Sequence, residues 1–431
     1  RRQATSRPRL GSKKRMPNSV MSDDSLHRLE VDEVCGLFFE GAKRISSIIE
    51  KTDNYDQIIQ NSIPKDILFA FTLNLSLNEM RDQAYHITSN SLLKTPKKRL
   101  LPQFSEFACF ARTDNNLKEI VFFDYLCKEI GISASNSNYA FAEYRSNWQL
   151  TGSQNNAFTR LNSDIRSFYE NCTSITPSLV RQFTLYCNAF ASYLVSFTSR
   201  GAVRPAAFVI ANDHSPVHVA LSMILKAFSI PRIYMQHAQV SSRFPPLDFE
   251  YSVLRNHISY ETYDSIEPIN TSYFIIPRHR EKQEYHLLSR PLAEPVSIVI
   301  YPTASTISSA FNRIIHALKS NPFVARVFVK EHPNNPIELK RTVDNTSICF
   351  LDEIPSFPHI AIVGNSSIAI ELLERGIAVY QNFDFDPVSR DYYGFVESGL
   401  TFESSTSTLR ERFWRLYTLD NHWRQLFHDW A

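Results

Sequence analysis

Short apolar runs alternate with helical stretches in two parts of this chain, and this alternation restricts the fold more than any other feature. The first part begins with AAFVIA at residues 206–211, continues through VHVALSMILKAFSI and returns to an extended run in RIYMQH. Ser215 and Pro216 suit the start of the intervening helix. Strand, helix and strand in this order form a βαβ unit with parallel strands. We therefore expect an α/β fold.

The same alternation restarts after residues 277–295, a charged stretch containing prolines that indicates a linker between domains. Strands are predicted for VSIVIYP, RVFVKEHP, SICFL, HIAIVG and IAVYQ, and helices for ISSAFNRIIHALKS and IAIELLERG. Parallel strands with helices between them predict a second, doubly wound domain.

The first 200 residues are mostly helical in pattern, with VDEVCGLFFEGAKRISSIIEK and SLVRQFTLYCNAFASYLVSFTSRG the clearest helices. DILFAF and EIVFF are compatible with strands, and SNWQLTGSQNN with a loop. The predicted fold class is α/β with two Rossmann-like domains and a largely helical N-terminal region. The predicted segments are a basic tail or linker at 1–23, a first domain at 24–285 and a second domain at 286–431, closed by C-terminal helices.

Composition excludes several classes of protein. The net charge of +2 gives no general reason to expect a nucleic-acid partner, and no apolar run is long enough to span a membrane. The six cysteines form no CxxC pair, so we expect reduced thiols in a cytoplasmic protein. Residues 1–23 lack the apolar segment of a secretory signal, and the start at Arg1 suggests a preceding segment. A solvated tail is expected, with attraction to an anionic membrane surface as the alternative.

Polar residues follow both strands of the first βαβ unit. Asp213 and His214 come just after AAFVIA, and Gln236 and His237 end RIYMQH. The carboxyl ends of parallel strands share one edge, where α/β sheets bind ligands. His237 suits a general acid or base, or a hydrogen bond to an acidic sugar. A structural role is the alternative for His237 and for His214.

In the second domain, too, polar residues follow the carboxyl ends of the predicted strands. GNSS ends an apolar strand and starts a helix that carries Glu371, so its N–H groups and hydroxyls suit a phosphate, with helix capping as the alternative. Glu371 lies one turn further and suits a ribose, with a solvated helix face as the alternative. The candidate donor-binding residues are Tyr301, Thr303, Lys330, Glu331, His332, Pro333, Asn365, Ser366, Ser367 and Glu371.

YPT, KEHP and GNSSIAIELLERGIAV, in this order and spacing, resemble the nucleotide-binding half of GT-B glycosyltransferases. The resemblance is strongest to bacterial sialyltransferases and to Kdo (3-deoxy-D-manno-octulosonic acid) transferases of capsule and lipopolysaccharide assembly. It implies that His332, Ser366 and Ser367 hold the phosphate of CMP, with Glu371 near the ribose or base. The second domain would then bind a CMP-sugar, and the first would lie on the acceptor side.

ANDHSPVHVAL and IPRIYMQHAQVSSRFPPLDFEY resemble the acceptor-side domain of retaining β-Kdo transferases of O-antigen synthesis. That resemblance implies that Asp213 attacks the anomeric carbon and forms a covalent intermediate. The chemistry is reasonable in its own right, because a carboxylate can trap an oxocarbenium-like carbon while the GNSS turn and His332 stabilise the departing phosphate.

The expected reaction is transfer of Kdo from CMP-Kdo to a glycan acceptor, with the lipid-linked form favoured, in a cleft between the domains. No cofactor or metal is expected, because CMP carries one phosphate and no DxD motif ends a strand. FDFDP at 383–387 is interpreted as a loop, with metal binding as the alternative. Peripheral contact with the inner membrane and further transferase domains in the same polypeptide are also expected. The competing hypotheses are a sialyltransferase, a CDP-glycerol-dependent transferase and a non-catalytic glycan-binding module.

Overall fold

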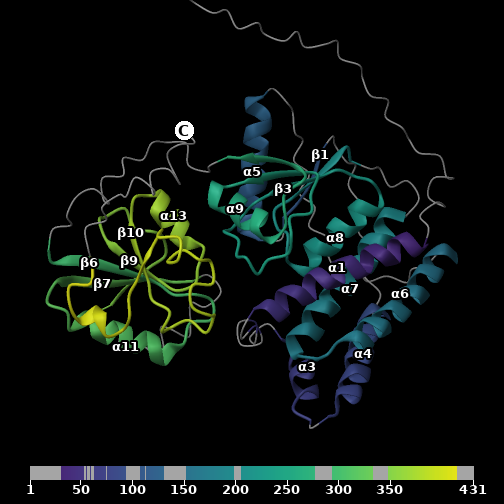
Figure 1. Cartoon of the computed structure of the whole chain (residues 1–431), viewed down its shortest axis with the longest axis horizontal. Coiled ribbons are helices and arrows are strands. Elements are labelled where there is room, and N and C mark those ends of the chain that lie inside the picture. The colour runs from purple at the N-terminus through teal and green to yellow at the C-terminus, as the bar shows by residue number, and fades with distance from the viewer. Residues whose placement is uncertain are drawn as a thin grey trace, which may run out of the picture.

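The computed structural model of the chain contains two α/β bodies, each built on a parallel sheet (Figure 1). The described residues are 31–52, 55, 59, 63–73, 75–93, 107–111, 113–130, 152–198, 205–276, 294–332 and 348–414. The predicted α/β fold class is confirmed: the chain has two Rossmann-like domains and a largely helical N-terminal region. The predicted boundary at 285/286 and the tail at 1–23 lie outside the described residues.

The first sheet has five parallel strands that lie in the order of the sequence. They are β1 (Phe107–Phe110), β2 (Ala207–Ile210), β3 (Arg232–Met235), β4 (Tyr251–Leu254) and β5 (Ser272–Ile275). Parallel sheets are covered on both faces, so their inner strands are apolar at consecutive positions. In β2, Phe208 and Ile210 belong to one core, whereas Val209 belongs to the core on the opposite face.

Helices cover the two faces of this sheet unequally (Figure 1). One face carries the helices of the N-terminal region together with α8, and the other carries α5. The helices of this body are α1 (Val31–Lys51), α3 (Lys65–Ala70), α4 (Leu77–Leu93), α5 (Asp114–Glu129), α6 (Gly152–Asn171), α7 (Pro177–Thr198), α8 (Pro216–Ala227) and α9 (His257–Ile266).

The second sheet has six parallel strands in the order β11-β10-β9-β6-β7-β8. They are β6 (Val296–Tyr301), β7 (Val324–Lys330), β8 (Cys349–Leu351), β9 (Ile360–Val363), β10 (Ala378–Gln381) and β11 (Phe402–Glu403). The chain proceeds outward from β6 to β8 and then restarts at β9 on the other side of β6. This reversal is the topological switch point, beside which α/β sheets bind ligands.

Two α-helices and one 3-10 turn are described in the second body. They are α11 (Ser308–Lys319), α13 (Ile368–Glu374) and the 3-10 turn η4 (Thr408–Arg410). Phe311, Ile314, Ile315 and Leu318 of α11 are buried and share one helix face, which explains why this helix was predictable from its spacing.

Several local predictions were wrong. DILFAF forms α3, and EIVFF lies inside α5, because a short apolar run by itself does not distinguish a strand from a helix. The predicted loop at 146–156 ends earlier than expected, since α6 begins at Gly152. The strand β1 was not predicted at all.

The predictions that concern membranes fall largely outside the described residues. The closing helices would lie mainly at 415–431, and the described part of that segment contains only η4 as regular structure. None of the helices in the described ranges combines the length and apolar character of a membrane span.

The two bodies contact one another through the segments that follow their strands. The main-chain N–H of Tyr392 donates to Asn365 Oδ1 over 2.8 Å, and its carbonyl accepts from Ser241 Oγ over 2.7 Å. Arg255, which follows β4, lies 3.6 Å from the Glu374 carboxylate at the end of α13. The hydrogen bond from Ser241 to Tyr392 and the ion pair between Arg255 and Glu374 therefore cross from one body to the other.

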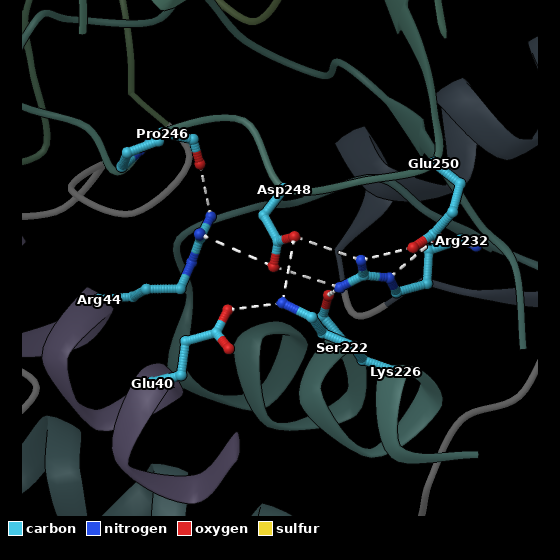
Figure 2. Close-up of polar contacts among 8 residues, drawn as sticks. All are labelled: Glu40, Arg44, Ser222, Lys226, Arg232, Pro246, Asp248 and Glu250. Atoms are coloured by element: carbon cyan, nitrogen blue, oxygen red, sulfur yellow. Dashed lines mark hydrogen bonds and ion pairs between the residues drawn. The ribbon is translucent and has the colours of Figure 1, made fainter. Parts of the chain in front are cut away.

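A network of charged side chains holds the segment between β3 and β4 (Figure 2). Arg232, with a side chain 2% exposed, donates to the Glu250 carboxylate over 2.7 and 3.0 Å. It also donates to Asp248, whose Oδ1 lies 3.5 Å from Lys226 Nζ. Arg44 of α1 lies 3.9 Å from Asp248 Oδ2. The network ties α1 and α8 to the segment that enters β4.

Candidate functional site

The turn after β2 is built around the side chain of Asn212. Its Oδ1 accepts from the main-chain N–H groups of His214 and Ser215 over 3.1 and 2.7 Å. Pro216 then occupies the first position of α8, as predicted, while the Ser215 hydroxyl makes no capping hydrogen bond. The amide cap fixes the backbone on both sides of Asp213 and directs this residue to the carboxyl edge of the sheet.

Asp213 is buried, with 3% of its surface exposed. Its Oδ1 lies 3.0 Å from His214 Nδ1, and its Oδ2 accepts a hydrogen bond from the Tyr263 hydroxyl. Burial raises the pKa of the Asp213 carboxyl, but the hydrogen bond and charge of His214 and the hydrogen bond from Tyr263 outweigh it. The pKa therefore lies below its ordinary value, and the group is a carboxylate at neutral pH.

His237 lies beside this pair, as the topology predicted. The rings of His214 and His237 are nearly parallel, with centroids 6.1 Å apart. Burial, and then the charge of His214, lower the pKa of His237 to about 4. His237 is consequently a neutral imidazole at pH 7.

Gln236 is fully buried, and its side-chain amide is hydrogen-bonded within the first body. Its Nε2 donates to the Ala238 carbonyl over 2.8 Å and to Ser259 Oγ over 2.7 Å. Its Oε1 accepts from the main-chain N–H of Arg255 over 2.8 Å. The side chain joins the ends of β3 and β4 and the start of α9.

The second candidate rim lies at the switch point of the second sheet. β6 lies between β9 and β7, so the residues after these three strands are neighbours, as predicted. Thr303 closes a tight turn, because its N–H donates to Thr306 Oγ1 over 2.8 Å. A Cβ at Gly364 would lie 2.7 Å from Asp386 Oδ2 and 3.1 Å from Thr303 Cγ2, so the close approach of these segments requires glycine.

The GNSS turn has fewer open N–H groups than the sequence suggested. The Asn365 N–H donates to Asp386 Oδ2 over 2.7 Å, and the Ser366 N–H donates to the Gly364 carbonyl over 3.0 Å. Ser366 Oγ accepts a long hydrogen bond of 3.4 Å from the N–H of Ile368, so capping is weak there. Ser367 makes no side-chain capping bond. The hydroxyls are thus more suitable than the main chain for a ligand.

Asn365 and Asp386 hold this turn against the segment after β10. Asn365 Nδ2 donates to the Ser389 carbonyl over 3.1 Å, and its Oδ1 accepts from Tyr392 as described above. Asp386 accepts from Asn365 and from the N–H of Val388. Burial outweighs both hydrogen bonds and raises the pKa of Asp386 to about 6.

Two of the predicted donor-binding residues have partners inside the second body. Tyr301 is 1% exposed, and its hydroxyl lies 3.0 Å from His359 Nε2. Glu371 accepts from Arg375 over 2.6 Å, one helical turn away. The structure therefore places a salt bridge, rather than a single carboxylate, on this part of α13.

The end of β7 contributes Lys330, Glu331 and His332. Lys330 Nζ donates to the Glu331 carbonyl over 3.1 Å. Burial, and then the charge of Lys330, lower the pKa of His332, which favours the neutral ring at pH 7. Pro333 lies outside the described residues.

No protein-family model matches the sequence, and no curated protein matches it. Among solved structures, the chain is similar to one described as the glycotransferase of kitacinnamycin, with 10% sequence identity and a TM-score of 0.40. The similarity covers 72% of this chain and 88% of the other. The roles of individual residues therefore rest on their own geometry.

Three residues of these rims were not found from the sequence. Tyr263 and Tyr234 supply a chain of hydroxyls to Asp213, with 3.2 Å between the two hydroxyl oxygens. Asp386 was interpreted as part of a loop. The buried positions of α9 mix Ile258, Ser259 and Tyr263, so the helix carries only a weak hydrophobic signal in the sequence.

Proposed function

We propose that the protein is a glycosyltransferase that transfers Kdo from CMP-Kdo to a glycan acceptor of a bacterial O-antigen or capsule. The observation that carries the proposal is the bridge at Tyr392, whose main chain is hydrogen-bonded to both Asn365 and Ser241. Asn365 follows β9, and Ser241 belongs to the segment after β3. A group transfer between a donor on one rim and an acceptor on the other requires such proximity.

On the donor side, we assign the phosphate of CMP to His332 and to the hydroxyls of Ser366 and Ser367. This assignment is supported by the adjacency of β7, β6 and β9 and by the switch point between the last two. Lys330 supplies a nearby cation for the departing phosphate. The pair formed by Glu371 and Arg375 suits the ribose, because it offers both an acceptor and donors.

The proposed transfer uses neither a cofactor nor a metal, because CMP leaves as a phosphate monoester that protein donors can stabilise. In the described part of the chain, no three His, Cys, Asp or Glu side chains are grouped in a way that could hold a metal ion. The acceptor that we propose is a lipid-linked glycan at the cytoplasmic face of the inner membrane.

The donor can be tested by measuring the release of CMP from CMP-Kdo and from CMP-sialic acid, and glycerol phosphate transfer from CDP-glycerol. We expect turnover of CMP-Kdo and calorimetric binding of CMP that is weakened about tenfold or more by Ser366→Ala combined with Ser367→Ala. Ser320→Ala is the matched control, because Ser320 follows α11 and its hydroxyl bonds the His316 carbonyl. Turnover of another donor reassigns the substrate, and failure to bind any cytidine nucleotide favours a glycan-binding module.

Retention through a covalent intermediate on Asp213 is the mechanism predicted from the resemblance. The carboxylate that would attack accepts from the Tyr263 hydroxyl through Oδ2, and its Oδ1 lies 3.0 Å from His214 Nδ1. Intact-mass spectrometry after incubation with CMP-Kdo tests this mechanism, because a sugar-acid adduct absent from Asp213→Asn would establish the nucleophile. Release of CMP without an adduct favours direct displacement.

A further inference from the structure

The contacts of Asp213 hold the ring of His214 in one orientation. The Asp213 side chain is 1% exposed and its two oxygens are bonded to His214 and Tyr263, whereas the His214 side chain is 30% exposed. The carboxylate is therefore enclosed, and the imidazole is the member of the pair that an acceptor can reach. We propose that His214 is the catalytic base of the transfer, that Asp213 is its positioning residue, and that Tyr263 holds Asp213. This inference rests on the proposed function for the identity of the reaction.

The hydrogen bonds determine where the proton of His214 lies. An ionised carboxylate can only accept hydrogen bonds, so the contact between Asp213 Oδ1 and His214 Nδ1 requires the proton on Nδ1. Nε2 of the neutral ring then carries the lone pair. The His214 side chain is 30% exposed, so a lone pair is available on a ring that solvent reaches, and the buried carboxylate stabilises the imidazolium that forms.

The groups that face this pair favour the same assignment. From α9 and β3 come the hydroxyls of Tyr263 and Tyr234, which remain protonated because burial raises the pKa of both. From the segment after β3 comes His237, which is neutral.

Two charged groups among the described residues act on the neighbours of this pair. The positive charge of Arg255 lowers the pKa of His237 and so disfavours its protonation. The negative charge of Glu119 raises the pKa of Tyr234. The Phe244 ring packs on the His214 ring, with centroids 4.6 Å apart, and limits its rotation. Asp213 is an acidic residue in direct contact with His214, with 3.0 Å between Oδ1 and Nδ1.

The step can be written with its atoms and electrons balanced. The acceptor hydroxyl forms a bond to the anomeric carbon while its proton moves to His214 Nε2. The bond from that carbon to the phosphate oxygen breaks, and CMP departs with the electron pair. One carbon–oxygen bond forms as another breaks, and the configuration at the anomeric carbon is inverted.

The first test is the tautomer of His214, which is independent of any substrate. Proteins labelled with ¹⁵N-histidine are compared by NMR, and His214→Gln assigns the signal among the 13 histidines of the chain. We expect an unprotonated Nε2 and a protonated Nδ1 in the unmutated protein, and a mixture of tautomers in Asp213→Asn. A protonated Nε2 in the unmutated protein would overturn the proposal.

The second test separates the roles by kinetics. Asp213→Asn and His214→Gln should each lower kcat by about 100- to 10,000-fold, the range of a general base, with little change in KM for the donor. Tyr263→Phe removes one hydrogen bond to a charged group and should lower kcat about tenfold. Tyr260→Phe on the same helix is the matched control, because its ring stacks on Tyr273 rather than on this cluster.

The stereochemistry of the product decides between the two mechanisms. An inverted product supports His214 as the base, whereas a retained product or an adduct on Asp213 overturns the assignment. Normal turnover by Asp213→Asn overturns it as well. If no CMP-activated sugar is turned over, the donor proposal fails, and the tautomer measurement still decides where the proton of His214 lies.

Discussion

At the scale of single residues, two buried aspartates show that the donors around a carboxylate decide its charge. Asp213 and Asp386 are 3% and 5% exposed. The first is bonded to an imidazole and a hydroxyl, and its pKa is lowered. The second accepts, among the described residues, from the main-chain N–H groups of Asn365 and Val388, and burial raises its pKa to about 6. The two groups therefore affect stability in opposite ways as the pH changes.

The effect of Asp386 can be measured with Asp386→Asn. Because its folded pKa is raised from 3.8 to about 6, the folded state holds this proton more tightly than the unfolded state. The stabilisation is complete below about pH 4 and is lost as the pH rises through about 6. At about 1.4 kcal/mol per tenfold change in proton affinity, the loss amounts to about 3 kcal/mol. Urea denaturation of both proteins from pH 4 to pH 7 checks it.

The unmutated protein should lose stability relative to Asp386→Asn over that interval. A difference in the free energy of unfolding that stays constant from pH 4 to pH 7, or that rises with pH, contradicts the assignment.

Sequence reasoning predicted which side chains lie together at the edge of the sheet better than it predicted the contacts of each side chain. Asp213, His214 and His237 come together because they follow neighbouring parallel strands, which the βαβ pattern already implied. Gln236 and Asn365 follow strands too, yet their amides join main-chain segments. An amide can donate and accept at once and suits either purpose, so its neighbours in space decide its role.

At the scale of elements, the network of Figure 2 fixes the segment that leads from β3 into β4. Its members come from α1, α8 and β3, and therefore from distant parts of the sequence. The apolar runs of β2 and β9 were predictable because all four residues of each strand are buried. The charge network was not, because no local pattern marks which surface charges meet after folding.

Burial predicts which members of the network matter for stability. Arg232 has a side chain 2% exposed, whereas Lys226 is 36% exposed. Arg232→Met leaves Asp248 and Glu250 without their main partner and should cost about 3 kcal/mol, the low end for a broken buried pair because both carboxylates retain contact with water. Lys226→Met should cost less than about 1 kcal/mol. Urea denaturation at pH 7 measures both, and equal costs would refute burial as the deciding factor.

At the scale of the whole molecule, the two sheets were predictable and their contact was not. Each sheet follows from alternating strands and helices, but the bridge through Tyr392 joins side chains more than 100 residues apart in the sequence. The switch point could not be located without the order of the strands in the sheet, which the pattern of the sequence does not reveal. In the first sheet the described strands lie in chain order, so they show no reversal, and the candidate site there was predicted from the polar residues that follow β2 and β3.

The contact between the bodies is tested through Arg255. Its guanidinium donates to the His237 carbonyl over 3.2 Å and lies 3.6 Å from Glu374, so it links the segment after β3 to the end of α13. If this link supports the contact, Arg255→Gln should accelerate amide hydrogen exchange about tenfold in both 236–244 and 368–376, since a loss of about 1.4 kcal/mol changes a local opening constant tenfold. Arg390→Gln is the control, because its partner Glu403 lies in the same body. Faster exchange in 236–244 alone would mean that Arg255 stabilises only its own body and that the bodies are joined by other contacts.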